Sequence, residues 1–304
     1  MPEAPICPEG CHDTSVRELL KRLGLRPQKQ FGQNFLVSRG VLDDIVASAH
    51  LSKEDVVVEV GPGLGILTEA MATEAGKVIA VEIDHGLAAA LKEKFQRLAN
   101  VTVVEGDILD VSPEELVGTL GRAEPPGYKV VANLPYYISS AVLNHFLGSA
   151  MKPQLMVVTV QKEVGQSIAA KPGDMSFLSV LVQFYAKPTI VRVVPAGCFY
   201  PAPKVDSVVL RLELRSEPPE PISDVEDFFR FVKCGFRAPR KQLRNPLSSC
   251  LGMAPSRVGA IMADAGVDPA RRAETVSIHE WAIMYARFVA DADYQSARQA
   301  KHSS

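Results

Sequence analysis

The run Asn133-Leu134-Pro135-Tyr136 has the clearest chemical potential in the chain. Asn133 carries a side-chain carbonyl, and the proline that follows Leu134 holds the Leu134 backbone carbonyl outward, so two hydrogen-bond acceptors converge. Such a pair suits an exocyclic amino group, for example N6 of adenine. The ring of Tyr136 offers a face on which a base can stack, worth about 1–3 kcal/mol. These residues predict a base-binding site, against the structural alternative of a proline-rich turn with a core tyrosine.

A glycine loop and two carboxylates precede this run. Gly61 and Gly63 belong to the loop GPGLG at residues 61–65, which follows a short β-branched run. Glycines let the backbone turn sharply and let a ligand lie close to it. Glu82 ends the next such run about 20 residues later, where a carboxylate can accept hydrogen bonds from ribose hydroxyls. Asp107 follows the third run, again at a strand end where α/β sheets bind ligands.

The spacing of the glycines bears on which ligand the loop binds. Dinucleotide-binding loops read G-x-G-x-x-G, whereas this loop reads G-x-G-x-G and has Ile66 in the last position. Glu59 stands two positions before the first glycine, where a carboxylate is unfavourable beside a pyrophosphate but compatible with a cationic sulfonium amino acid. The loop therefore favours S-adenosylmethionine as the cofactor. Glu59 itself has two interpretations, a bond to loop amides or a direct contact with the ligand.

A parallel sheet is expected to position these groups. Apolar, β-branched runs alternate with helix-compatible segments, which is typical of a parallel sheet buried on both faces. The expected strands cover residues 56–60, 78–83, 101–104, 128–131 and 155–160, followed by two closing antiparallel strands at 189–194 and 205–214. Two amphipathic helices are expected upstream, near residues 16–23 and 41–49. The predicted fold class is α/β, with a Rossmann-like sheet.

A linker divides the chain of 304 residues, which is long for a single domain. The linker, EPPEP at residues 217–221, separates the strand-rich part from a part that shows only helical patterns. We expect a catalytic domain over residues 1–215, which opens with a loose extension at 1–25. A small all-helical domain is expected over residues 216–304.

The composition excludes several classes of protein. Hydrophobic residues make up 47% of the chain and charged residues 22%, values that exclude collagen-like, disordered and coiled-coil chains. No run approaches the roughly 20 apolar residues of a membrane helix. Five cysteines are an odd and sparse set, which favours a reducing, cytoplasmic compartment. Cys7 and Cys11 with His12 lack a second ligand pair at zinc-site spacing, so we expect no metal.

Basic residues are unevenly distributed, although the net charge of −2 alone promises no nucleic-acid partner. Residues 228–263 contain seven Lys and Arg and no Asp or Glu, and apolar residues interleave with them. This pattern predicts RNA-phosphate binding by Arg237, Arg240, Lys241 and Arg244. Residues 17–40 carry six basic residues against Glu18 alone, and there a solvated face explains the pattern equally well.

Five sequence blocks occur in the order found in one enzyme family. They are FGQNFL at 31–36, NLPYYIS at 133–139, QKEV at 161–164, FYPAPKVDS at 199–207 and FRAPRKQLRN at 236–245. Over about residues 25–290 the chain resembles the ribosomal RNA adenine N6-methyltransferases, and in particular their small-subunit dimethylating branch. The resemblance implies a class I methyltransferase fold, with S-adenosylmethionine as the methyl donor.

The resemblance also implies which residues meet the cofactor and the target base. The cofactor residues are Asn34, Leu36, Gly61, Glu82, Asp107 and Asn133, together with Gly63 of the same loop. Phe199 is expected to clamp the target base opposite Tyr136. The implied substrate is a pair of adjacent adenosines in a loop near the 3′ end of 16S rRNA, each dimethylated at N6. The partner would be the 30S subunit or its precursor, with the chain acting as a monomer in subunit maturation.

Methyl transfer from S-adenosylmethionine to N6 requires no metal, cysteine nucleophile or dedicated base. The sulfonium methyl is already activated, so transfer is an in-line displacement by N6, whose lone pair is delocalised into the ring. Asn133 and the Leu134 carbonyl would hold both N–H bonds and aim the lone pair at the methyl, and orientation of this kind lowers the barrier by several kcal/mol. Two alternatives remain: a 23S rRNA adenine methyltransferase of the macrolide-resistance type, and a non-catalytic assembly or transcription factor with the same fold.

Overall fold

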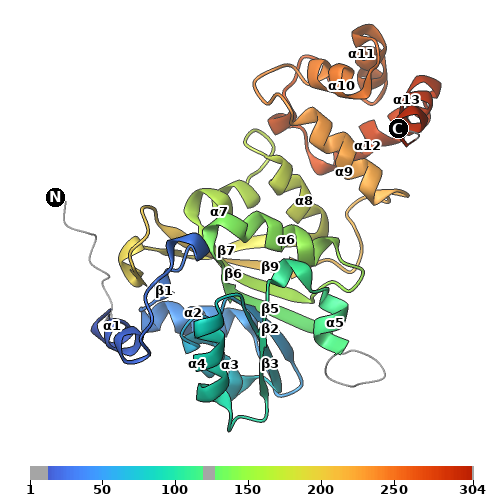
Figure 1. Cartoon of the computed structure of the whole chain (residues 1–304). Helices are drawn as coiled ribbons and strands as arrows, with labels where there is room; N and C mark the ends of the chain where they lie inside the picture. Colours follow the sequence, from blue (N-terminus) through green and yellow to red (C-terminus); the bar gives the residue numbers. More distant parts are fainter. Residues whose placement is uncertain (1–12, 119–126, 303–304) are drawn as a thin grey trace, which may run out of the picture. The chain divides into compact units, whose positions relative to one another are not determined.

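A computed structural model describes residues 13–118 and 127–302. The chain forms two compact units (Figure 1). The first comprises Met1–Gln166 and Lys187–Leu214, and the second comprises Ser167–Ala186 and Arg215–Ser304. Cys7, Cys11 and His12, at which we expect no metal, lie outside the described residues, as do residues 1–12 of the predicted extension at 1–25. Within the rest of that extension, Asp13–Arg22 form a helix rather than a loose segment.

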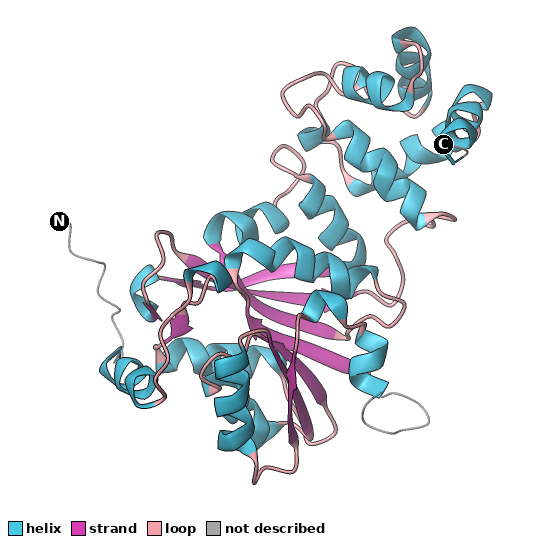
Figure 2. Cartoon of the chain, in the orientation of Figure 1, coloured by secondary structure: helices cyan, strands magenta, loops and turns pink. Residues whose placement is uncertain are grey.

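A seven-stranded sheet in the order β4-β3-β2-β5-β6-β9-β7 forms the centre of the first unit (Figures 1 and 2). Its strands are β2 (Val56–Val60), β3 (Lys77–Glu82), β4 (Val101–Glu105), β5 (Tyr128–Asn133), β6 (Leu155–Gln161), β7 (Ala186–Val194) and β9 (Ser207–Leu214). The pairs from β4 through to β6 are parallel, and β9 runs antiparallel to β6. The predicted parallel sheet is therefore confirmed, within one or two residues at most strand ends.

Helices pack on both faces of this sheet. The described helices of the first unit are α1 (Asp13–Arg22), α2 (Arg39–Ala49), α3 (Ile66–Glu74), α4 (His85–Phe95), α5 (Pro113–Gly118), α6 (Ser139–Gly148) and α7 (Lys162–Ile168), of which α1 packs against Phe35 rather than on the sheet. Ile45 of α2 and Met71 of α3 share a core cluster with Val57 of β2. On the opposite side, Phe146 of α6 packs against Tyr128, with ring centroids 6.3 Å apart. β2 is buried along its whole length, as its continuous valine run predicts.

A two-stranded sheet outside the main one brings the N-terminal segment to the rim of the first unit. Strand β1 (Phe35–Leu36) pairs antiparallel with β8 (Phe199–Tyr200), and Leu36 lies opposite Phe199. Short 3₁₀ helices complete the unit: η1 (Lys29–Phe31), η2 (Ile108–Asp110), η3 (Tyr136–Ile138) and η4 (Ala196–Cys198).

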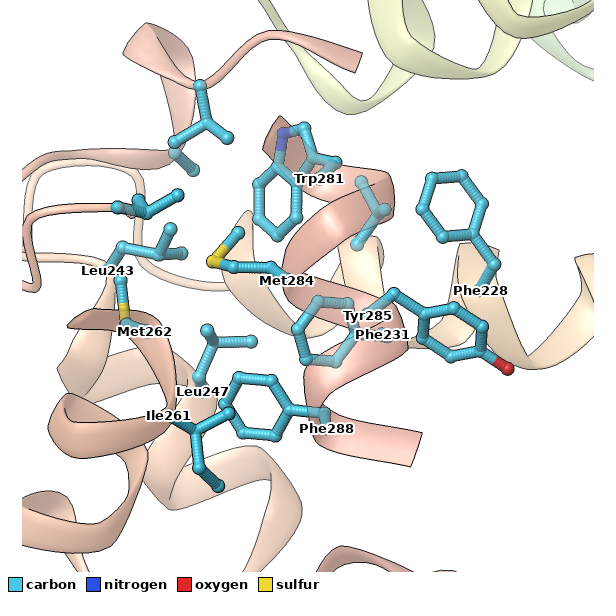
Figure 3. Close-up of a cluster of buried hydrophobic side chains, with 14 of the residues drawn as sticks. Phe228, Phe231, Leu243, Leu247, Ile261, Met262, Trp281, Met284, Tyr285 and Phe288 are labelled. Carbon is cyan, nitrogen blue, oxygen red and sulfur yellow. The ribbon is translucent and has the colours of Figure 1, made fainter. Parts of the chain in front are cut away.

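The second unit is helical, and its core combines aromatic side chains with aliphatic ones and methionines (Figure 3). It contains α8 (Phe177–Tyr185), α9 (Val225–Gly235), α10 (Arg244–Leu251), α11 (Pro255–Asp264), η5 (Ala273–Thr275), α12 (Ile278–Val289) and α13 (Ala292–His302). Phe231 of α9 packs between Trp281 and Phe288 of α12, with ring centroids 5.9 and 4.9 Å away. No helix within the described ranges is long and apolar enough to cross a membrane.

Two features of this unit differ from the sequence expectations. Residues 167–186, which we assigned to the first domain, belong to the helical unit because Phe184 of α8 stacks near Phe228, at 5.5 Å between centroids. Cys234 and Cys250 form a disulfide, whereas the cysteine pattern predicted reduced thiols. Cys198 is buried and is not part of this disulfide.

Candidate active site

A pocket opens at the carboxyl ends of β2, β3 and β5 in the first unit. The order of the strands reverses at this place, because β2 has β3 on one side and β5 on the other. Open α/β sheets bind their ligands at such a switch point. The pocket is lined by most of the predicted site residues: Asn34, Leu36, Gly61, Gly63, Glu82, Asp107, Asn133, Leu134, Pro135 and Tyr136.

The glycine loop needs its glycines for two reasons. Gly61, Gly63 and Gly65 have φ values of +64°, +58° and +72°. Residues with a Cβ adopt such a backbone conformation only with strain, whereas glycine adopts it readily. A Cβ on Gly63 would also lie 3.0 Å from the ring of Phe35. The bare backbone therefore forms one wall of the pocket, and a ligand can approach it closely.

Glu82 is held in one orientation by two backbone amides. Gly63 donates its N–H to Oε2 and Asp84 donates its N–H to Oε1, both at 3.0 Å. The side chain is only 4% exposed, and this burial raises the pKa of its carboxyl, while the two amide bonds oppose the rise. The structure thus places a fixed, buried acceptor at the end of β3, where the sequence predicts it.

Glu59 is the second buried carboxyl of the pocket. It is 1% exposed, and burial raises its pKa to about 8. Thr68 of α3 donates a hydrogen bond to its Oε2 at 2.6 Å. Among the described residues its bond therefore comes from a helix side chain rather than from a loop amide, and Gly63 bonds Glu82 instead. The first of the two interpretations of Glu59, a bond to loop amides, is therefore wrong for this structure.

Asp107 begins η2 and caps it. Its Oδ1 accepts the N–H of Leu109 at 2.9 Å, which fixes the carboxylate at the end of β4 beside the pocket. A carboxylate in this place, one strand away from Glu82, widens the polar rim of the pocket.

Asn133 ends β5, and its amide is oriented by a bond to the N-terminal segment. Its Nδ2 donates to the backbone carbonyl of Asn34 at 3.0 Å. Because that carbonyl can only accept, the amide nitrogen must face it, and Oδ1 is left as an acceptor. Leu134 is anchored next to it, since its N–H donates to the carbonyl of Thr159 on β6 at 3.2 Å. The two predicted acceptors, the side-chain oxygen of Asn133 and the backbone carbonyl of Leu134, are thus held in place by hydrogen bonds to neighbouring segments.

Two tyrosines follow on η3. The Tyr136 hydroxyl shares a hydrogen bond of 2.7 Å with Ser207, and burial raises the pKa of this phenol. Tyr137, which the sequence reasoning missed, also lines the pocket and is 57% exposed. A Cβ on Gly32 would lie 3.1 Å from its ring, so Tyr137 covers that glycine closely. Its place directly after the predicted aromatic was the available signal.

Phe199 is not brought to the pocket. It is 4% exposed, belongs to the same core cluster as Leu36, and is absent from the pocket lining. In β8 it lies opposite Leu36, and its ring is buried in the cluster that both residues share. The expected aromatic clamp opposite Tyr136 is therefore not formed by Phe199 in this structure.

The predicted RNA-binding residues lie in the second unit, along the connection from α9 to α10. Arg237, Arg240 and Lys241 are exposed. Arg244 opens α10 and is partly buried, and its Nε has no hydrogen-bond partner in the part of the chain that the structure describes. The loop thus presents three solvent-facing cations and one that is partly enclosed.

Comparison with known proteins gives consistent matches. The model of the family described as ribosomal RNA adenine dimethylase matches residues 24–289. A protein named ribosomal RNA small subunit methyltransferase A from Dehalococcoides mccartyi is 48% identical over 267 residues, 88% of this chain and 90% of that protein. A protein of the same name from Moorella thermoacetica is 46% identical over 269 residues, 87% of this chain and 93% of that one.

Two solved structures resemble the fold. The 23S rRNA methyltransferase ErmE is 29% identical, with a TM-score of 0.65 over 84% of this chain and 99% of that one. A dimethyladenosine transferase from Plasmodium falciparum is 22% identical, with a TM-score of 0.71 over 84% of this chain and 98% of that one. Both likenesses agree with a class I methyltransferase sheet followed by helices.

Proposed function

Because the chain belongs to the ribosomal RNA adenine dimethylase family, we propose that it dimethylates N6 of two adjacent adenosines in a loop near the 3′ end of 16S rRNA. The observation that carries the proposal is the orientation of Asn133, whose amide nitrogen is taken by Asn34 and whose oxygen is left as an acceptor. An acceptor fixed beside the glycine loop suits an exocyclic amino group.

The pocket fits S-adenosylmethionine. The loop at Gly63 leaves no room for a side chain beside Phe35, so a ligand lies against bare backbone. Glu82 is fixed as an acceptor for ribose hydroxyls, and Asp107 stands beside it for the adenine end. Asn34 and Leu36 close the side of the pocket that β1 forms. When bound, the cofactor supplies a methyl group activated by its positive sulfur.

The chain itself binds and orients the target base. An adenosine inside a helix must leave its stack to enter such a pocket. In the first transfer the Oδ1 of Asn133 and the carbonyl of Leu134 then accept hydrogen bonds from the two N6–H groups, while Pro135 and the ring of Tyr136 hold the base in plane. In the second transfer one of these acceptors holds the single N–H that remains. Fixing N6 in this way removes orientational freedom before the reaction, which is the chief contribution that these residues make. The N6 proton leaves to water after transfer.

The RNA-contacting role of the second unit is part of the proposal. Arg237, Arg240, Lys241 and Arg244 would bind backbone phosphates of the rRNA, which suits the exposed positions of the first three. We further propose that the chain acts as a monomer in the cytoplasm, on the 30S subunit or its precursor, during subunit maturation.

A 23S rRNA methyltransferase is the second candidate, because ErmE shares the fold at 29% identity. The small-subunit assignment is favoured by the higher identity, 48%, to a protein named for that subunit. A non-catalytic factor is disfavoured because the pocket keeps its oriented Glu82 and Asn133.

A single experiment tests the proposal. The chain is incubated with tritiated S-adenosylmethionine and with undermethylated 30S particles, 50S particles or DNA, and the labelled nucleoside is identified after digestion. We expect N6,N6-dimethyladenosine from the 30S particles alone. Label in 50S particles would instead establish the 23S alternative, and no label in any arm would refute the enzymatic role.

A further inference from the structure

A groove adjoins the active-site pocket in the first unit, and the proposed mechanism assigns it no role. We name it the N-terminal groove. Its walls come from α1, from the segment at residues 25–29, from Tyr200 of β8 and from Pro201 after it. It shares Gly32, Gln33 and Asn34 with the active-site pocket, so the two hollows adjoin at these residues.

The charge of the groove is one-sided. Its lining contains the cations Arg17, Lys21, Arg26 and Lys29 and no carboxylate. Lys21, Arg26 and Lys29 are exposed, and the ion pairs of the described residues involve none of these three. The guanidinium of Arg17 lies over the ring of Tyr200, 4.7 Å from its centroid. Such a surface attracts a polyanion.

The size and layout of the groove suit a chain of phosphates rather than one ion. It is an open hollow of about 760 Å³, which is more than one ion would fill. Arg17 and Lys21 lie one turn apart on the same face of α1, and Arg26 and Lys29 continue along the segment that follows. Four cations in succession match the repeating charge of a single nucleic-acid strand.

The groove is also tied firmly to the active site. Val16 and Leu20 of α1 pack in a small core with Phe35, which contacts the glycine loop. The amides of Gln28 and Gln33 both donate to Oδ2 of Asp84, at 2.7 and 3.0 Å. If the groove binds RNA next to the active site, these contacts hold the groove in a constant position relative to Asn133.

We propose that the N-terminal groove binds the sugar–phosphate strand that flanks the target adenosine. The strand would pass from the base at Asn133 across Asn34, whose backbone carbonyl holds the Asn133 amide, and into the cations beyond. The inference rests on the proposed function, and it identifies where the substrate RNA lies outside the reacting corner.

Neutralising the groove tests the inference. In a triple variant, Lys21→Gln, Arg26→Gln and Lys29→Gln remove three charges. The matched control is Arg22→Gln, Arg97→Gln and Lys187→Gln, three exposed cations of the same unit that do not line the groove. Affinity for the rRNA substrate is measured against salt concentration, and the affinity for S-adenosylhomocysteine is measured in parallel.

We expect the groove variant to bind RNA at least tenfold more weakly at low salt. The slope of log affinity against log salt should fall by about 2, since each single-strand phosphate contact contributes roughly 0.7. Cofactor affinity should stay within twofold, and the control variant should show neither change. If the groove variant keeps the wild-type slope while the wild-type chain methylates 30S particles, the inference is wrong and the proposed function stands.

A second measurement uses the unaltered chain. RNA that carries 4-thiouridine next to the target adenosines is cross-linked by light, and the attached peptide is identified by mass spectrometry. Cross-links within residues 17–33 support the groove, and cross-links confined to other segments overturn it. A wild-type chain that methylates no RNA at all refutes the proposed function, and the groove assignment with it.

Discussion

The side-chain amide of Asn133 donates to the backbone carbonyl of Asn34 across 99 positions of sequence, at 3.0 Å. This bond joins the end of β5 to the segment that precedes β1, and both residues line the pocket. It decides which end of the Asn133 amide faces into the pocket. It also makes the orientation of Asn133 depend on a segment that belongs to the N-terminal groove.

Replacing Asn133 tests this orientation directly. Asn133→Ala removes the acceptor, and Asn133→Asp sets a carboxylate oxygen against the Asn34 carbonyl, where two acceptors repel. We expect both variants to lose at least about a hundredfold in kcat, as misplacement of reacting groups does, while cofactor binding remains. Asn100→Ala is the control, because Asn100 donates to the Ala72 carbonyl at 2.9 Å far from the pocket lining. Near-normal turnover in Asn133→Ala would refute the role.

Glu82 should determine cofactor affinity. In Glu82→Gln an amide NH₂ must face the N–H of either Gly63 or Asp84, so the fixed acceptor is lost. A hydrogen bond to a charged group is worth about 1.5–3 kcal/mol, which predicts roughly 10- to 100-fold weaker binding of S-adenosylhomocysteine by calorimetry. Glu105→Gln is the matched control, since Glu105 is the register partner of Glu82 on β4 but is exposed and outside the pocket. Equal losses in both variants would contradict the prediction.

Glu59 should make stability fall with rising pH. Its pKa is about 8 in the folded chain against an ordinary value of 4.5, so the folded state holds a proton that the unfolded state has released. The stabilisation is complete below pH 4.5 and is lost as pH rises through 8, up to about 5 kcal/mol in all. Glu59→Gln keeps an acceptor for Thr68 and should flatten this slope. Denaturant unfolding from pH 5 to 9, with exposed Glu93→Gln as control, checks the difference.

The main sheet could be predicted from sequence because its signal is local. The valine run at residues 56–60 is buried on both faces, which is what a continuous apolar strand requires. The glycine loop, Glu82 and Asn133 were located for the same reason, since each stands at the end of such a run. The two-residue strands β1 and β8 have no comparable pattern, so the burial of Phe199 beside Leu36 could not be predicted from the sequence.

Long-range contacts explain what the sequence did not reveal. An apolar helix between two strands resembles a crossover of the sheet, so α8 was assigned to the first domain. Its true partner is set by packing of Phe184 against Phe228, 44 positions later. The bond between Asn34 and Asn133 and the pairing of Cys234 with Cys250 are likewise contacts between separate segments. Neither secondary-structure propensity nor hydrophobic periodicity indicates which distant segments will contact each other.

The disulfide between Cys234 and Cys250 should stabilise the helical unit. It closes a loop of 16 residues between α9 and α10, which by chain entropy contributes about 3 kcal/mol. We expect dithiothreitol to lower the melting temperature of the wild-type chain and to leave that of the double variant Cys234→Ser, Cys250→Ser unchanged. Thiol titration of the unreduced, denatured chain is the independent check. Two reactive thiols at these positions would show that the pair is not joined.

Leucine at two aromatic positions separates base contact from core packing. Tyr136→Leu removes the ring that we propose stacks on the target base, so kcat/KM should fall about 10- to 100-fold with little change in melting temperature, since stacking is worth about 1–3 kcal/mol. Phe199→Leu removes a ring that is 4% exposed and packed near Leu36, so it should lower stability by about 1–2 kcal/mol and leave kcat/KM within threefold.

One result of comparing Phe199→Leu with Tyr136→Leu would contradict the assignment of Phe199 to the core. If Phe199→Leu loses as much activity as Tyr136→Leu while its melting temperature stays at the wild-type value, then Phe199 contacts the base, and β8 must rearrange when RNA binds. A loss of stability alone would confirm that the ring belongs to the core. Tyr137→Leu, measured beside them, asks whether the exposed aromatic of the pocket supplies the second stacking face, because its ring is 57% exposed and lines the same hollow.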